Sequence, residues 1–217
     1  MRNIFIVVLV LAGLFVGIIF SSASTGALIY ESFDYSTGSV VGQDGGQGWG
    51  SAWTQPQTDG TEEVVADSLS FSDYQTSGGA LKLVDTDPDW GVIGVRRQLG
   101  MDFNTGDDVW VSYLSKIDVV QSSNASRTAE FRHGPTAGTT KLRMQPKGTN
   151  SQGVMVAYDS DGNNSAGENV QDGRTYLTIV RFGDIGTADG KYAVMWVFDE
   201  AGYDAMMADG TITESEL

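Results

Sequence analysis

Cysteine is absent from this 217-residue chain, and histidine occurs only once, at His133. Without cysteine the chain forms no disulfide, and it lacks both a thiol nucleophile and the thiolate ligands of zinc and iron–sulfur sites. A single histidine also excludes a metal site built from several histidines. The fold must therefore be stabilised by its core alone.

Basic residues are scarce as well. The chain has 13 Lys and Arg residues against 28 Asp and Glu residues, which gives a net charge of −15. Such a charge repels nucleic acid and anionic lipid surfaces. Nucleic-acid partners are therefore not expected, and the composition suits a soluble protein outside the cell.

The only long apolar run lies at the N-terminus. Arg2 precedes the uncharged residues 4–20, and small residues follow up to Ala27. This order is typical of a secretory signal peptide, with cleavage after Ala23 or Ala27. The run also reaches the lower limit for a membrane span, so an uncleaved anchor is the alternative and the only expected membrane contact. We predict a signal peptide over 1–27 and one secreted or cell-surface domain over 28–217.

Beyond this segment, short apolar runs alternate with Gly-, Asp- and Asn-rich turns, and helical periodicity is almost absent. On the last run, Tyr192, Val194, Trp196 and Phe198 share the face that we expect to pack, and 203–209 is the one helix-like piece. The pattern predicts an all-β fold, a two-sheet antiparallel β-sandwich of the jelly-roll type. The expected strands are 28–34, 64–71, 79–84, 91–99, 108–118, 127–132, 140–145, 153–158, 174–182 and 190–198.

The C-terminal stretch "DGTITESEL" is polar and has no strand character. In two-sheet rolls the terminal strands usually lie side by side and close an edge. The expected strand 28–34 has no evident late partner, so we predict that the domain is incomplete at its C-terminus.

The opening "LIYESFDYSTGSVVGQDGGQGWGSAW", together with "DDVWVSYLSKID" and "RTYLTIVRF", resembles the concanavalin A-like lectin/glucanase superfamily. The resemblance is closest to its laminin-G-like, secreted bacterial members and covers roughly residues 28 to 200. It implies a jelly-roll sandwich and a role in glycan binding or cell-surface adhesion.

Three tryptophans are candidate ligand-binding residues. Trp49 and Trp53 lie in the glycine-rich loop, where they either form a sugar-binding platform or are buried for stability. Burial is favoured, because removing an indole from water stabilises a fold by a few kcal/mol. Trp90, in the turn-like "DPDWG", is expected to be the more exposed indole.

Catalytic and metal motifs are weak. The E-x-D-x-x-E pattern of the superfamily's glucanases is missing, so we predict no enzyme activity. Asp159 and Asp161 begin a turn-like segment and are only weak candidates for calcium ligands, while 205–216 matches only half of an EF-hand loop. We therefore predict no cofactor, with Ca²⁺ on a rim loop as the alternative.

Basic residues cluster between 127 and 147. Arg132 and Arg143 belong to this cluster, and on paired strands they would form a strip able to bind an anionic polysaccharide. The alternative, which we favour, is ordinary alternation of solvent-facing positions. The sequence as a whole predicts a secreted, non-catalytic module that binds a cell-surface polysaccharide or serves adhesion. A purely structural spacer and a degenerate glycoside hydrolase remain as alternatives.

Overall fold

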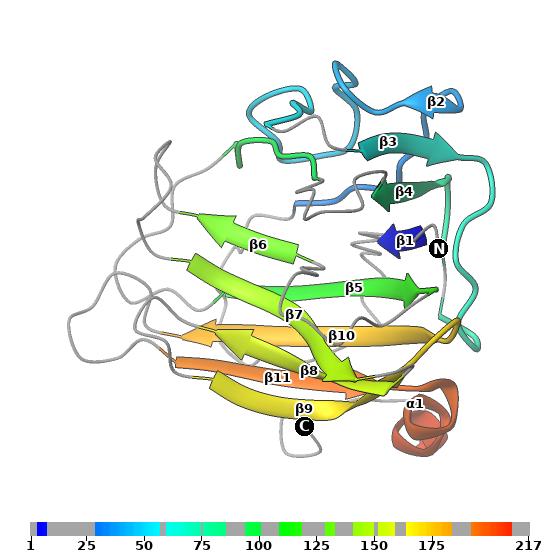
Figure 1. The fold of residues 1–217 in the computed structure, drawn as a ribbon, viewed down its shortest axis with the longest axis vertical. Helices are drawn as coiled ribbons and strands as arrows, with labels where there is room; N and C mark the ends of the chain where they lie inside the picture. Colours follow the sequence, from blue (N-terminus) through cyan, green and yellow to red (C-terminus); the bar gives the residue numbers. More distant parts are fainter. Residues whose placement is uncertain are drawn as a thin grey trace.

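In the computed structural model, the regular structure of the described residues consists mostly of strands, which form two antiparallel sheets, with one short helix (Figure 1). The larger sheet has seven strands and the smaller has four. The structure describes residues 4–7, 29–56, 60–74, 76–85, 94–100, 109–118, 129–132, 141–149, 152–158, 164–183 and 192–209.

Neighbouring strands in each sheet are hydrogen-bonded in the following order. The larger sheet runs β11 (Tyr192–Phe198), β10 (Thr175–Gly183), β5 (Val109–Ile117), β1 (Ile4–Val7), β4 (Ala80–Asp85), β3 (Gly60–Val65) and β2 (Gly38–Ser39). The smaller sheet runs β6 (Ala129–Arg132), β7 (Lys141–Thr149), β8 (Gln152–Tyr158) and β9 (Asn164–Gln171).

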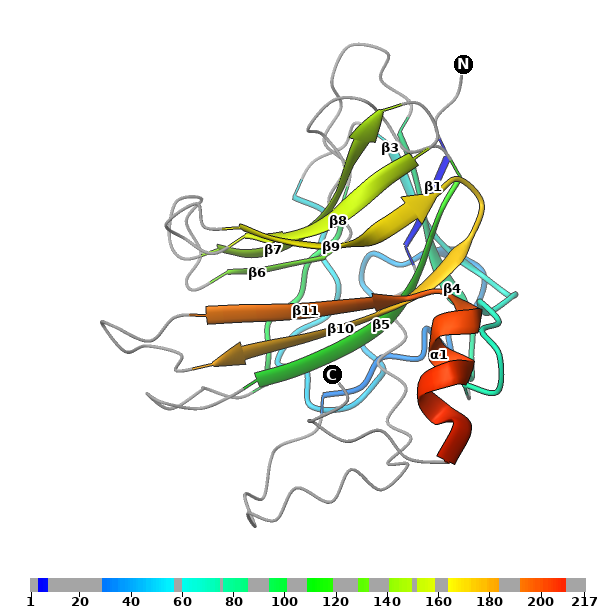
Figure 2. The same ribbon diagram turned by 90° about the horizontal axis from the view of Figure 1, so that it is seen from below.

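The two sheets form layers, with the smaller sheet above one face of β5, β10 and β11 (Figure 2). Strand alternation separates the two faces, because successive side chains point to opposite sides. On this inner face the side chains are buried: Val111, Tyr113, Ser115, Ile117, Tyr176, Thr178, Val180, Met195 and Val197. The opposite, outer face carries the residues between them.

The prediction that the face of β11 with Val194, Trp196 and Phe198 packs against the core is wrong. Met195 and Val197 are buried, whereas Val194 is 38 % exposed and Trp196 and Phe198 are half-buried. Both faces of this strand are apolar, so alternation alone could not decide which one faces the core.

Most other predicted strands are confirmed to within a few residues, but four differences matter. The expected strand 64–71 overlaps β3 only at residues 64 and 65, and residues 66–71 form no strand. Within the expected strand 28–34, the described residues 29–34 are irregular, and Tyr30 makes only an isolated bridge to Gln47. β9 was not predicted, because its sequence NSAGENVQ is polar. Residues 94–100, part of another expected strand, make only isolated bridges, while 86–93 lie outside the described residues.

The N-terminal apolar segment contributes a strand. Ile4–Val7 forms β1 between β4 and β5, although residues 1–27 were expected to lie outside the domain. Without β1, the N–H and C=O groups of β4 and β5 that face each other would lack partners. The extended segment Ile4–Val7 pairs with them, which explains its position. The boundary at residue 27 stays a prediction.

Helix α1 (Glu200–Met206) covers one end of the outer face of the larger sheet. The predicted helix at 203–209 is thus confirmed but begins earlier, and it continues as a 3₁₀ turn over Met207–Asp209. Asp199 caps its N-terminus by accepting from the Gly202 amide at 2.9 Å. Tyr203 of this helix packs against three buried side chains. Phe71 comes from a loop, Leu114 from β5 and Leu177 from β10.

The hydroxyl of Thr178 allows a test of how the inner face of the larger sheet is stabilised. Thr178 is buried, and within the described chain its Oγ1 has no hydrogen-bond partner. Thr178→Val removes this unsatisfied group while keeping its shape, so we expect the free energy of unfolding to rise by about 1 kcal/mol. Urea unfolding, at an unchanged m-value, measures the gain.

Thr175→Val, at a half-buried position of the same strand, is the matched control and should change stability by less than about 0.5 kcal/mol. A loss of stability in Thr178→Val would show that the hydroxyl is in fact hydrogen-bonded.

Candidate functional site

The glycine-rich loop folds around an ion pair. Nη1 of Arg97 lies 2.7 Å from Oε2 of Glu31, and the two side chains are 1 % and 0 % exposed, respectively. Arg97 is held beside the loop by backbone pairing on both sides, since Thr54 bridges Arg96 and Trp49 bridges Leu99. The loop and the segment 94–100 are therefore joined along their backbones before any side chain is considered.

Glu31 is saturated by protein donors. Its Oε1 accepts from the Phe33 amide at 2.9 Å. Its Oε2 accepts from the Tyr35 hydroxyl at 2.9 Å and from Nε1 of Trp53 at 3.1 Å, in addition to Arg97. A buried carboxylate is tolerated when charge and hydrogen bonds compensate for lost water, and here both conditions are met.

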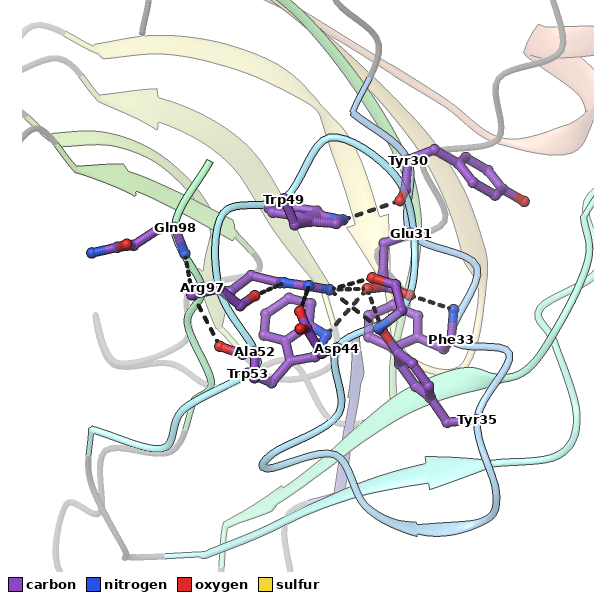
Figure 3. A network of polar contacts seen from close by, with 12 residues as sticks. Tyr30, Glu31, Phe33, Tyr35, Asp44, Trp49, Ala52, Trp53, Arg97 and Gln98 are labelled. Carbon is purple, nitrogen blue, oxygen red and sulfur yellow. Dashed lines mark hydrogen bonds and ion pairs between the residues drawn. The ribbon is translucent and has the colours of Figure 1, made fainter. Parts of the chain in front are cut away.

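Arg97 is equally well satisfied (Figure 3). Its Nε donates to the Ser51 carbonyl at 2.9 Å, and its Nη1 donates to the Gly45 carbonyl at 3.0 Å. Its Nη2 contacts Oδ1 of Asp44 at 3.1 Å. The guanidinium also lies 4.7 Å from the ring centroid of Trp49 and 5.2 Å from that of Trp53, which is cation–π geometry.

The close approach of the loop to this pair requires glycine. Gly46 has φ of +76°, and a Cβ there would lie 2.5 Å from the Tyr30 carbonyl oxygen. A Cβ at Gly45 would lie 2.6 Å from the ring of Tyr35. The glycines thus allow the backbone to wrap tightly around the ion pair rather than making the loop loose.

The two tryptophans of the loop serve this network. Trp53 is only 5 % exposed and stacks on Phe33 with ring centroids 5.8 Å apart. Trp49 is half-buried, and its Nε1 donates to the Tyr30 carbonyl at 3.0 Å. These contacts favour the structural interpretation of both residues, most clearly for Trp53.

The hydrogen bonds around the Glu31–Arg97 pair also indicate a structural role for it. Burial and the neighbouring Glu31 raise the pKa of the Tyr35 hydroxyl, so Tyr35 stays a hydrogen-bond donor to the carboxylate. Every oxygen of Glu31 is occupied by a protein donor. The arrangement therefore leaves Glu31 poorly placed to exchange a proton with a bound molecule.

A second buried carboxylate, Glu62, lies on β3. Its Oε2 accepts from Nε2 of Gln55 at 2.6 Å, and its Oε1 accepts from the Gly94 amide at 3.4 Å. Burial raises the pKa of the Glu62 carboxyl, and these two hydrogen bonds oppose the rise. Because its donors are neutral, Glu62 is less well compensated than Glu31.

The outer face of the larger sheet carries an aromatic patch away from α1. Trp110 on β5 and Trp196 on β11 are half-buried, and their rings stack with centroids 5.8 Å apart and planes 7° apart. The Arg181 guanidinium lies 5.4 Å from the Trp110 ring centroid, and the exposed Val194 is opposite Arg181 in the register. We call these residues, Trp110, Arg181, Val194 and Trp196, the outer-face patch.

Neither Trp110 nor Trp196 was among the candidates from the sequence. Both occur in strongly apolar strand segments, "VWVS" and "MWVF", which read as core. Only the register places them on one face, because Arg181 of β10 is paired with Trp110 on one side and with Val194 on the other. No sequence signal fixes that register.

The remaining candidates do not form a site among the described residues. Trp90, Asp159 and Asp161 lie outside the described residues. The register places Arg132 opposite Lys141, but Arg143 opposite Glu130, so an acidic position interrupts the proposed basic strip. Within the described residues, no group of three or more His, Cys, Asp or Glu side chains is arranged to hold a metal ion.

Comparison with known proteins identifies no relative: no protein-family model, curated protein or solved structure matches this chain. Among the helices that the structure describes, none has the length and apolar character needed to cross a membrane.

Breaking the Glu31–Arg97 pair should be strongly destabilising. Arg97→Ala leaves a buried carboxylate without its counter-charge, so we expect the free energy of unfolding to fall by about 3–5 kcal/mol. Tryptophan fluorescence should shift to the red, since Trp49 and Trp53 lose the guanidinium that packs against both rings. Urea unfolding monitored by fluorescence measures both effects.

Asp44→Ala is the matched control, because it removes the other acidic partner of Arg97, whose side chain is 69 % exposed. Exposed pairs contribute less than about 1 kcal/mol, so its loss should be small. Equal effects of the two substitutions would contradict the central role of the buried pair.

Glu62→Gln should stabilise the fold in a pH-dependent way. The folded-state pKa of Glu62 is raised above its ordinary value of 4.5, so the folded state favours the neutral carboxyl. The stability contribution of the wild-type residue is full below pH 4.5 and is lost as the pH rises through the folded-state pKa. The gain of Glu62→Gln should therefore be larger at about pH 7 than at about pH 4.

Thermal melting at both pH values measures this difference, with Glu63→Gln as the control at the adjacent exposed position. A gain that is the same at both pH values would show that ionisation of Glu62 is not its cause.

Proposed function

We propose that this protein is a secreted, non-catalytic β-sandwich module of the jelly-roll type that binds carbohydrate at a cell surface. The resemblance of its opening motif to laminin-G-like bacterial domains suggests this class. The acidic charge, the absence of cysteine and the single histidine are compatible with a passive extracellular module.

The outer-face patch is the single observation that carries the binding proposal. Flat indole surfaces stack on the C–H faces of sugar rings, and a guanidinium donates hydrogen bonds to hydroxyl or carboxylate groups. Trp110 and Trp196 provide the aromatic surface, and Arg181 lies beside it. The patch lies on hydrogen-bonded strands and not on a loop, which favours a geometry that is set before a ligand binds.

The non-catalytic part of the proposal is supported by the two buried carboxylates. Glu31 is occupied by Arg97 and three further donors, and Glu62 by Gln55 and Gly94. Glycoside hydrolysis needs one carboxylic acid and one carboxylate facing a shared substrate. Neither residue is arranged in this way.

A structural spacer is the second candidate, and the burial of Trp53 favours it. Trp53 and the Glu31–Arg97 pair account for the conspicuous loop motif through stability alone. The two candidates differ only in whether the outer-face patch has a ligand.

Alanine at either tryptophan of the outer-face patch should weaken glycan binding. We expect the wild-type chain to be retained in affinity electrophoresis on a polysaccharide that a glycan array selects. Trp110→Ala and Trp196→Ala should each weaken the affinity by about tenfold or more, through the lost stacking surface.

Val41→Ala, at another exposed apolar position, is the control and should be retained like the wild type. Circular dichroism confirms that each variant is folded. Absence of retention on every polysaccharide of the array would favour the spacer.

A further inference from the structure

The larger sheet has a short strand at its centre. β1 has four residues, whereas its neighbours β4 and β5 have six and nine. β1 is antiparallel to both, and each neighbour makes three register pairs with it. The position between β4 and β5, which we call the acceptor slot, is therefore only partly used by its present occupant.

The two faces of the slot have different chemistry. On the inner face, position 5 lies opposite Leu83 of β4 and Ile117 of β5, which are both buried. On the outer face, position 6 lies opposite Lys82 of β4 and Lys116 of β5. A strand that fills the slot thus needs an apolar residue at position 5. Its residue at position 6 lies between Lys82 and Lys116, which are both positively charged.

The charges along this row alternate except at position 6. Glu63 of β3 is opposite Lys82, and the row continues through Ile6 to Lys116. Directly opposite residues of unlike charge stabilise a sheet, and an apolar residue at position 6 adds no such partner for Lys82 or Lys116. Lys116 reaches only Asp118, at 3.8 Å, and no ion pair of Lys82 occurs among the described residues. An acidic residue at position 6 would complete the alternation.

The present occupant comes from the segment that the sequence predicts to be removed during export. Cleavage after Ala23 or Ala27 would take β1 away and leave the backbone groups of β4 and β5 open at the centre of the sheet. Every other strand of the described chain is already paired within one of the two sheets. An open slot of this kind recruits an extended segment by β-strand addition.

We propose that the acceptor slot between β4 and β5 binds an extended segment of a partner polypeptide with the pattern apolar–acidic–apolar, antiparallel to both strands. The apolar residues enter the inner face, and the acidic residue lies between Lys82 and Lys116. β1 is a replaceable occupant of this slot.

A peptide-binding experiment on the full chain tests the proposal. Ile6→Pro removes a backbone donor from β1 and weakens its pairing, which makes the slot available. The probe is a fluorescent peptide, Thr-Ile-Phe-Glu-Val-Thr, and its control has Lys in place of Glu. Fluorescence anisotropy should show binding of the Glu peptide to Ile6→Pro, with about tenfold weaker binding of the Lys peptide.

Lys82→Ala combined with Lys116→Ala in the same chain should make the two peptides bind equally. Equal binding without those substitutions, or no binding to a folded Ile6→Pro chain, overturns the proposal. A dimer of Ile6→Pro that the peptide does not dissociate in sedimentation also overturns it, because a second copy of the chain would then fill the slot.

A second measurement decides the matter if Ile6→Pro does not fold. In the otherwise unchanged full chain, Ile6→Glu should raise the melting temperature above that of Ile6→Lys, because only glutamate pairs with the flanking lysines. The Lys82→Ala, Lys116→Ala background should abolish the difference. A melting temperature of Ile6→Glu at or below that of Ile6→Lys overturns the proposal.

Discussion

The buried pair of Arg97 and Glu31 organises the N-terminal part of this protein, because neither charge is tolerated in the interior without the other. Arg97 fixes the loop through the Gly45 and Ser51 carbonyls, and Glu31 fixes Tyr35 and Trp53. These contacts place Trp53 against a core cluster that also includes residues of β3 and β4: Phe33, Val40, Val64, Leu81 and Leu83. The ion pair thus connects a loop of little regular structure to one half of the larger sheet.

The other half of that sheet has a different arrangement. Its inner face is buried beneath the smaller sheet, while its outer face is covered at one end by α1 and carries the stacked pair Trp110 and Trp196 elsewhere. The protein therefore uses its tryptophans in two ways. Trp53 contributes to stability in the interior, and the pair on the outer face forms the surface that we propose for recognition.

Between these two halves lies the acceptor slot, where β1 joins β4 to β5. A sheet interrupted at this point would expose two rows of backbone groups, so its integrity depends on an occupant. The two halves have separate core clusters, one around Phe33 and Trp53 and one around Phe71 and Tyr203. The strand in the slot therefore joins the two halves through backbone pairing.

The sequence by itself determined the all-β class, most strands and the short helix, because turn residues and β-branched runs act locally. It could not determine which face of β11 is buried, since Val194–Phe198 is apolar on both faces. It gave no sign that Arg97 pairs with Glu31, because the partners are 66 positions apart and are joined by backbone bridges. Only the tertiary structure decided these points and the position of the outer-face patch, because the register between distant strands sets which side chains meet.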